Sequence, residues 1–346
     1  MSESQQKAFF LLAKFGDFGV RSKGIPTPGP GELLVKNGAV ALNPLDWMLQ
    51  KHEFGLETFP AVLGFDLAGT VEALGEGVTG FQKGDRVVAA AFWTERQAAF
   101  QEYTIASAKF TAKVPQSISI EQASTISVGA DTAAMGLYQA GQYGAGLVAP
   151  WAPGGQAKYS NKPLVVLGGA SSVGAYVIQF AKLSGFSPII ATASLHNAAY
   201  LESLGATHVL DRHLDAAALQ KEVTSISTLP IDLIYDAISE PDTQKLAYAL
   251  LADGGTLILT MPSGLGETAG GKIVKFVRGS PFMEGNDDVG EGLYASLHGY
   301  LDSGAIQPNR VELLPGGLSG IVAGLERLRE GKVSGAKLVV RPQETA

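Results

Sequence analysis

Short apolar runs separated by glycine-rich turns dominate the first third of the chain. This pattern predicts β-strands at 31–40, 65–73, 85–91, 103–106 and 110–114. Many short strands at such spacing are typical of an antiparallel, barrel-like unit. We therefore expect this part of the chain to form a β-rich domain.

The middle of the chain has a different pattern, in which strand-length apolar runs alternate with segments of helical periodicity. A helical segment at 120–139 is followed by a Gly/Pro-rich stretch that ends near residue 161. Beyond it, strands are predicted at 164–167, 189–193, 208–210, 231–235 and 256–261, with helices at 173–183, 198–204 and 244–251. This alternation predicts a parallel, doubly wound α/β sheet. The tail adds helices at 290–301 and 318–330 and a last strand at 337–341.

Composition narrows the class of protein. Of 346 residues, 46% are apolar and 17% are charged, which is typical of a globular chain. The net charge of 26 − 33 = −7, with no basic block, argues against nucleic acid as a partner. The absence of cysteine excludes disulfides, thiolate zinc sites and iron–sulfur clusters. With no signal-peptide pattern and no apolar run of about 18 residues, we expect a cytoplasmic protein without a membrane partner.

The segment 165–174, VVLGGASSVG, lies where a predicted strand ends and a predicted helix begins. A dinucleotide site needs this context, because the helix N-terminus presents backbone N–H groups and a positive dipole end to phosphates. We expect Gly169 to form the tight turn and Gly174 to let helix and strand pack closely. The predicted cofactor contacts here are Gly169, Ala170, Ser171, Ser172, Val173 and Gly174.

The residues after the second strand of this region bear on the choice between NADH and NADPH. NAD sites usually carry an acidic residue about 20 positions after the loop, which binds the ribose hydroxyls. This chain has Ser194, His196 and Asn197 there, and Arg212 follows the next strand. These donors suit a ribose 2′-phosphate and predict NADPH. The alternative is an ordinary polar loop with a helix cap.

Three blocks of the chain resemble medium-chain dehydrogenases/reductases: 64–87 (GFDLAGTV to GDRV), the loop above, and 331–339 (GKVSGAKLV). The resemblance spans the whole chain and is greatest to the zinc-independent branch of quinone oxidoreductases and fungal trans-acting enoyl reductases. It implies a GroES-like catalytic domain from 1–128 and 286–346 and a Rossmann NADP-binding domain from 129–285. Zinc-dependent relatives have Gly-His-Glu where this chain has Gly64-Phe65-Asp66, and its five histidines are scattered, so we expect no metal.

The resemblance also implies further site residues. Asn43, Pro44 and Asp46 belong to an Asn-Pro-x-Asp element that lies against the nicotinamide in the family. Family position adds further cofactor contacts at Thr132, Ala237, Ile238, Met261, Pro262, Ser263, Gly335 and Lys337.

The implied chemistry is hydride transfer to an alkene conjugated to a carbonyl, which needs a donor for the developing enolate but no metal. We predict Asn43, Asp46 and Lys51 as catalytic residues, with His52 and Tyr103 as further candidate donors. The expected partner is a small enal or enone, or an acyl chain on a carrier. A quinone reductase and a non-catalytic NADPH-binding scaffold remain as alternatives, and the chain is expected to be a monomer or a homodimer.

Overall fold

The chain folds into two compact units in the computed structural model, which describes residues 4–52 and 55–346. The first unit contains the residues up to Val128, together with Leu297–Asp302 and Pro308–Ala346. The second contains Gly129–Ser296 and Ser303–Gln307. Helix α8 (Asp287–Asp302) is divided between the units, with the residues up to Ser296 in the second and Leu297–Asp302 in the first.

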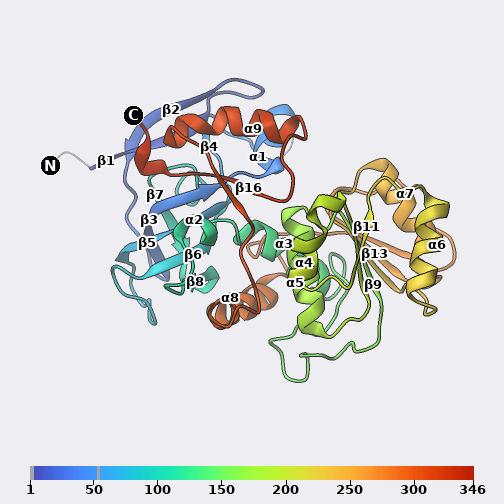
Figure 1. The fold of residues 1–346 in the computed structure, drawn as a ribbon. Coiled ribbons are helices and arrows are strands. Elements are labelled where there is room, and N and C mark those ends of the chain that lie inside the picture. The colour runs from blue at the N-terminus through green and yellow to red at the C-terminus, as the bar shows by residue number, and fades with distance from the viewer. Residues whose placement is uncertain (1–3, 53–54) are drawn as a thin grey trace. The chain divides into compact units, whose positions relative to one another are not determined.

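The first unit is built on two β-sheets (Figure 1). Three strands in the order β2-β1-β4 make the smaller sheet: β1 (Gln5–Leu11), β2 (Phe18–Gly24) and β4 (Ala61–Val62). The larger sheet has the order β15-β16-β3-β5-β6-β8, with β7 also paired to β3. Its strands are β3 (Glu32–Ala41), β5 (Asp66–Leu74), β6 (Arg86–Ala90), β7 (Tyr103–Ser107), β8 (Thr111–Lys113), β15 (Val311–Leu313) and β16 (Lys337–Val340).

These pairings are antiparallel except for β15 with β16, which confirms the β-rich prediction for the first third of the chain. The core between the sheets is formed by fully buried aliphatic and aromatic side chains, among them Leu33, Leu67 and Phe100. The α-helices that lie wholly within the described residues of this unit are α1 (Pro44–Lys51), α2 (Ile120–Ala123) and α9 (Ile321–Arg329).

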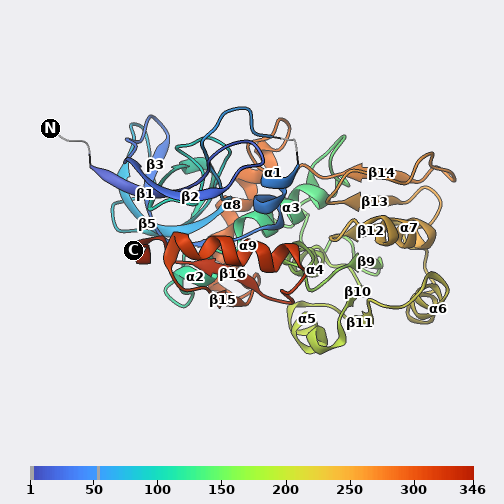
Figure 2. The same cartoon turned by 90° about the horizontal axis from the view of Figure 1, so that it is seen from above.

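The second unit contains a six-stranded, all-parallel sheet in the order β11-β10-β9-β12-β13-β14 (Figure 2). The strands are β9 (Leu164–Leu167), β10 (Ile189–Ala193), β11 (His208–Asp211), β12 (Leu233–Asp236), β13 (Thr256–Leu259) and β14 (Ile273–Phe276). Both faces carry helices: α3 (Ser127–Tyr138), α4 (Ser172–Ser184) and α5 (Ala198–Leu204) lie on one side, and α6 (Ala216–Ile226) and α7 (Pro241–Leu250) on the other. The predicted doubly wound sheet is confirmed.

The chain order of this sheet reverses next to its first strand, β9. The connections from β9 run to β10 and β11 on one side, whereas β12, β13 and β14 continue on the other. In open parallel sheets, ligands bind beyond the carboxyl ends of the strands at such a reversal. The loops that follow β9, β10, β12 and β13 are therefore where a cofactor site is expected.

The structure differs from the sequence prediction in a few elements. The segment predicted as one helix at 120–139 forms two, α2 and α3, which are separated by a short turn. Strand β14 was not predicted, because as an edge strand it is half exposed and lacks a continuous apolar run. Helix α1 was also missed, because Asn43-Pro44 is equally typical of a turn.

Candidate active site

The loop between β9 and α4 has the close backbone packing that a phosphate site requires. A Cβ atom on Gly174 would lie 2.3 Å from the carbonyl oxygen of Gly168, so only glycine lets α4 begin this close to β9. The left-handed turn is formed by Gly168, with φ of 75°, and not by Gly169 as expected. Gly169 instead packs against the next strand, because its Cβ would lie 2.9 Å from the Cβ of Ala191.

Ser171, the residue that departs from the usual glycine pattern, begins helix α4. Its Oγ accepts a hydrogen bond from the Gly174 backbone N–H at 3.0 Å, which makes it the N-cap. The first-turn N–H groups of a helix have no partner within the helix, and the dipole there favours anions. The predicted residues Ala170, Ser171, Ser172 and Val173 therefore lie at an end of α4 that fits a pyrophosphate.

Two of the four predicted ribose-side residues are bonded to each other. The Arg212 Nε donates to Ser194 Oγ at 3.0 Å, and both follow strands whose ends are paired in the sheet. His196 and Asn197 lie beside them in a short 3₁₀ turn, with the Asn197 Nδ2 and His196 Nε2 atoms 3.1 Å apart. The nearest carboxylate on β11, Asp211, accepts a bond from the His213 N–H at 3.0 Å. The arrangement presents an exposed guanidinium beside a hydroxyl.

The loops after β12 and β13 are linked by a residue that the sequence analysis missed. Gln244 of α7 donates to the carbonyl oxygens of Ser239 at 2.8 Å and Pro262 at 3.1 Å, and accepts from the Gly264 N–H at 2.8 Å. Gln244 thus connects the two loops that contain five predicted cofactor contacts: Ala237, Ile238, Met261, Pro262 and Ser263. Ile238 and Met261 are each 38% exposed, which leaves them available to a ligand.

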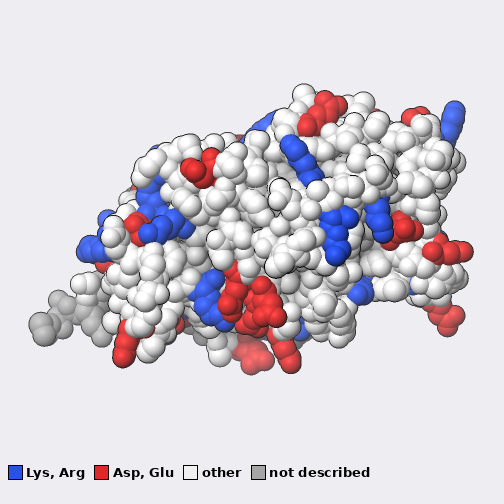
Figure 3. All heavy atoms as spheres, turned by 90° about the horizontal axis from the view of Figure 1, so that it is seen from below, with Lys and Arg blue, Asp and Glu red and all other residues white. Residues whose placement is uncertain are grey.

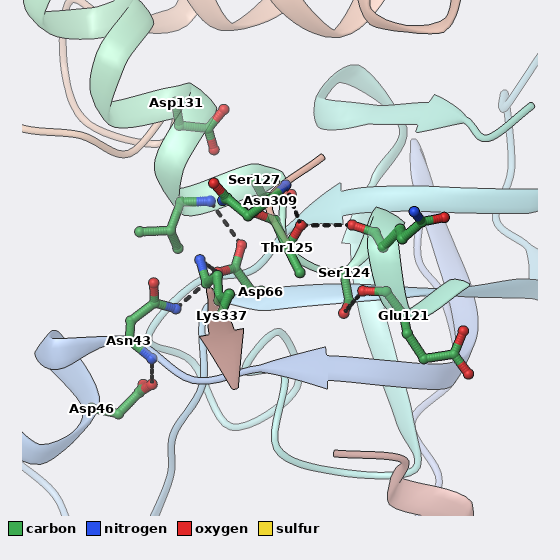
Figure 4. A network of polar contacts seen from close by, with 12 residues as sticks. Asn43, Asp46, Asp66, Glu121, Ser124, Thr125, Ser127, Asp131, Asn309 and Lys337 are labelled. Carbon is green, nitrogen blue, oxygen red and sulfur yellow. Dashed lines mark hydrogen bonds and ion pairs between the residues drawn. The ribbon is translucent and has the colours of Figure 1, made fainter. Parts of the chain in front are cut away.

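In the first unit, a buried carboxylate collects donors from three segments of the chain (Figure 4). Asp66 Oδ2 accepts from the Asn43 Nδ2 at 2.9 Å and forms an ion pair with the Lys337 Nζ, while its Oδ1 accepts from the Val128 N–H at 2.8 Å. Asn43, Asp66 and Lys337 are all buried. Asn43 and Lys337 are predicted cofactor contacts, whereas Asp66 has no predicted role in the site.

Asp46 is held at the start of α1, three residues after Asn43. Its Oδ2 accepts from the Asn43 backbone N–H at 2.7 Å, a bond that is typical of helix N-termini. Burial raises the pKa of Asp46 to about 8, and the nearby Asp66 carboxylate adds to the effect. The group is therefore mostly protonated at neutral pH, and its geometry is that of a residue that orders the Asn43 backbone.

Lys51, the third predicted catalytic residue, lies on the same helix as Asp46. Lys51 is the last residue of α1, and eight helical residues span about 10 Å. It lines, with Arg329, a pocket of about 230 Å³. His52 follows it, with its ring 6.1 Å from the Trp47 ring, and Tyr103 begins β7.

Two further predicted cofactor contacts, Thr132 and Gly335, lie in helix α3 and just before strand β16. Thr132 is in α3, where its carbonyl oxygen accepts from the Tyr235 hydroxyl at 2.8 Å. Gly335 has φ of 62° in the turn before β16 and so requires the left-handed conformation that glycine tolerates.

Among the residues that the structure describes, no three His, Asp or Glu side chains form a group that could hold a metal ion. Within the same residues, no helix is both long and apolar enough to cross a bilayer. On the face drawn in Figure 3, Lys and Arg are interspersed with Asp and Glu and form no extended basic surface.

Family comparisons cover both units. Residues 29–116 match the alcohol dehydrogenase GroES-like domain, and residues 172–270 match the zinc-binding dehydrogenase family. The trans-enoyl reductase resD of Aspergillus sclerotiorum is 32% identical over 350 residues, covering 93% of this chain and 96% of that protein. The trans-enoyl reductase FSL5 of Gibberella zeae is 33% identical over 333 residues, covering 89% of each chain.

Solved structures share the fold at lower sequence identity. An alcohol dehydrogenase superfamily protein from Novosphingobium aromaticivorans is 24% identical, with a TM-score of 0.81 over 97% of this chain and 99% of that one. The quinone oxidoreductase from Coxiella burnetii is 23% identical, with a TM-score of 0.72 over 98% and 99% of the two chains. These likenesses show that the chain shares the fold of these proteins.

Proposed function

Because the chain belongs to the medium-chain dehydrogenase/reductase family, we propose that it reduces carbon–carbon double bonds conjugated to a carbonyl, with NADPH as the hydride donor. The observation that carries this proposal is the full-length similarity to several fungal trans-enoyl reductases, at 32–34% identity over 89–93% of this chain for three of them. The cofactor loop with its glycine packing and the Ser171 cap supports nicotinamide dinucleotide binding.

The preference for NADPH rests on Arg212 and Ser194. A guanidinium can donate two parallel hydrogen bonds to a phosphate, and such charge-assisted bonds contribute about 1.5–3 kcal/mol each. Arg212 Nε already donates to Ser194 Oγ at 3.0 Å, and this bond does not use the terminal guanidinium nitrogens. NADH has a hydroxyl in place of the 2′-phosphate and would gain little from this pair.

Replacing Arg212 by alanine is therefore expected to raise the KM for NADPH about tenfold or more and to leave the KM for NADH nearly unchanged. Steady-state kinetics with both cofactors measures this. Lys221→Ala, an exposed cation on α6 of the same unit, is the control and should alter neither KM. An equal rise for NADPH and NADH would contradict the assignment of Arg212 to the 2′-phosphate.

For this reaction the protein must hold substrate and cofactor in position and provide one hydrogen-bond donor to the substrate's carbonyl oxygen. NADPH, when bound, supplies a hydride to the β-carbon of the substrate. Negative charge then develops on the substrate's carbonyl oxygen, giving an enolate. A proton from water is then added to the α-carbon. Asn43 is the proposed donor to that oxygen, because its amide has a second N–H besides the one that Asp66 accepts. Asp46 supports the backbone of Asn43, and Lys51 lies on the same helix, five residues after Asp46.

The assay that tests this function follows NADPH oxidation by the purified protein with a trans-2-enal, its thioester counterpart and an ortho-quinone in parallel. We expect turnover of the enal or the thioester, with the saturated carbonyl compound as the product. Turnover of the quinone alone would contradict the proposal in favour of a quinone reductase. NADPH binding without turnover of any acceptor would favour a scaffold.

A further inference from the structure

Three neighbouring strands bring Asn43, Asp66 and Lys337 to one point in the first unit. Strands β16, β3 and β5 are adjacent in the sheet, and Ala41 at the end of β3 pairs with both Val339 and Asp66. Asn43 follows β3 by two residues, and Lys337 begins β16. The sheet register therefore determines that the Asp66 carboxylate meets both side chains.

The Asp66 carboxylate has three hydrogen-bond partners in this arrangement, and all three are donors. The Lys337 ammonium compensates its charge where the two side chains are only 0% and 4% exposed. The third donor, the Val128 N–H, lies in the first turn of α3, where a negative charge is favourable. Further along the same helix is Thr132, a predicted cofactor contact.

The carboxylate also determines how the Asn43 amide is oriented. An ionised carboxylate only accepts hydrogen bonds, so the amide must turn its Nδ2 toward Asp66, at 2.9 Å, and its oxygen away (Figure 4). The second N–H of the amide is then held in one direction. A buried amide without this partner would lose that single orientation.

We infer that Asp66 is a positioning residue, which acts on the reduction through Asn43 by holding its amide in the orientation that donates to the substrate's carbonyl oxygen. Lys337 pairs its ammonium with the Asp66 carboxylate and so holds that carboxylate beside Asn43. This inference rests on the proposed function, because it assigns Asn43 to the developing enolate. It adds a residue that the family resemblance did not bring to the site.

A double-mutant cycle in kcat for enal reduction tests the inference. Asn43→Ala removes the donor and is expected to lower kcat on the order of 100-fold. Asp66→Asn leaves the donor but misorients it, and is expected to lower kcat on the order of tenfold. In the Asn43→Ala background, Asp66→Asn should then change kcat by less than about twofold, since there is no amide left to orient.

Asn37→Ala is the matched control for general damage to this unit. Asn37 is another fully buried amide, and its Nδ2 donates to the Ala99 and Gln101 carbonyl oxygens and to Thr104 Oγ1. Its loss should lower the melting temperature without lowering kcat. If Asp66→Asn does not fold, the cycle is run with the charge-balanced Asp66→Asn/Lys337→Met variant, which leaves no buried charge unpaired.

The outcomes separate this inference from the proposed function. If the wild-type protein reduces no enal or thioester, the proposed function fails, and the role of Asp66 fails with it. If the wild-type protein is active and Asp66→Asn costs the same factor in both backgrounds, or nothing in either, the proposed function stands and the positioning role is overturned. A cost seen only when the Asn43 amide is present supports the role.

Discussion

Replacing Gly174 by alanine is expected to reduce NADPH affinity at least 100-fold. The new Cβ would lie 2.3 Å from the Gly168 carbonyl oxygen and 2.9 Å from the Gly169 Cα, and both are backbone atoms of the phosphate loop. Backbone atoms cannot move aside as a flexible side chain can. Helix α4 must therefore shift away from β9, which separates the helix N-terminus from the loop that would receive the pyrophosphate.

Equilibrium titration of NADPH by its fluorescence measures this effect. Gly299→Ala is the matched control, because Gly299 is also helical and a Cβ there would meet no atom within 4 Å. That variant should bind NADPH normally and melt at the same or a slightly higher temperature, since alanine favours helix by about 1 kcal/mol over glycine. Normal NADPH affinity in Gly174→Ala would show that the loop does not bind the cofactor.

Lys337→Met is expected to destabilise the first unit by about 3–5 kcal/mol, because it leaves the buried Asp66 carboxylate without its counter-ion. An ion pair on the protein surface provides the comparison with this buried pair. Lys332 and Glu330 are 2.6 Å apart but 65% and 40% exposed, and such pairs contribute about 0–1 kcal/mol. Lys332→Met should therefore have little effect on stability.

Urea unfolding of the variants checks this expectation. The charge-balanced Asp66→Asn/Lys337→Met variant should be more stable than Lys337→Met alone, because it contains no uncompensated buried charge. If the two variants were equally unstable, the loss of lysine packing would be the cause, and the electrostatic account of the pair would be wrong.

The sequence predicts the fold correctly where burial produces a regular pattern of apolar residues. Strands β9 and β10 are buried on both faces and appear as continuous apolar runs, so their predicted bounds match the structure. The hairpin of β1 and β2 was missed, because β2 is half exposed and includes polar residues along its length. Edge strands lack the pattern on which such prediction depends.

The candidate site was harder to predict from the sequence, because its contacts join residues that are far apart in the chain. Asp66 and Lys337 are separated by 271 positions and meet only through the register of β16, β3 and β5. Nothing in the local sequence around Gln244 indicates that it bonds two loops at once. The left-handed turn was assigned to Gly169 rather than Gly168, since adjacent glycines cannot be distinguished by spacing alone.

The most direct test of the central claim is the position of the hydride in the product. NADPH carrying deuterium at the transferable C4 position is incubated with the protein and a trans-2-enal or its thioester, and the product is examined by mass spectrometry and NMR. We predict a saturated carbonyl compound with one deuterium on the β-carbon. Deuterium on the former carbonyl carbon of an unsaturated alcohol, or the absence of any deuterated product, would contradict alkene reduction as the function of this chain.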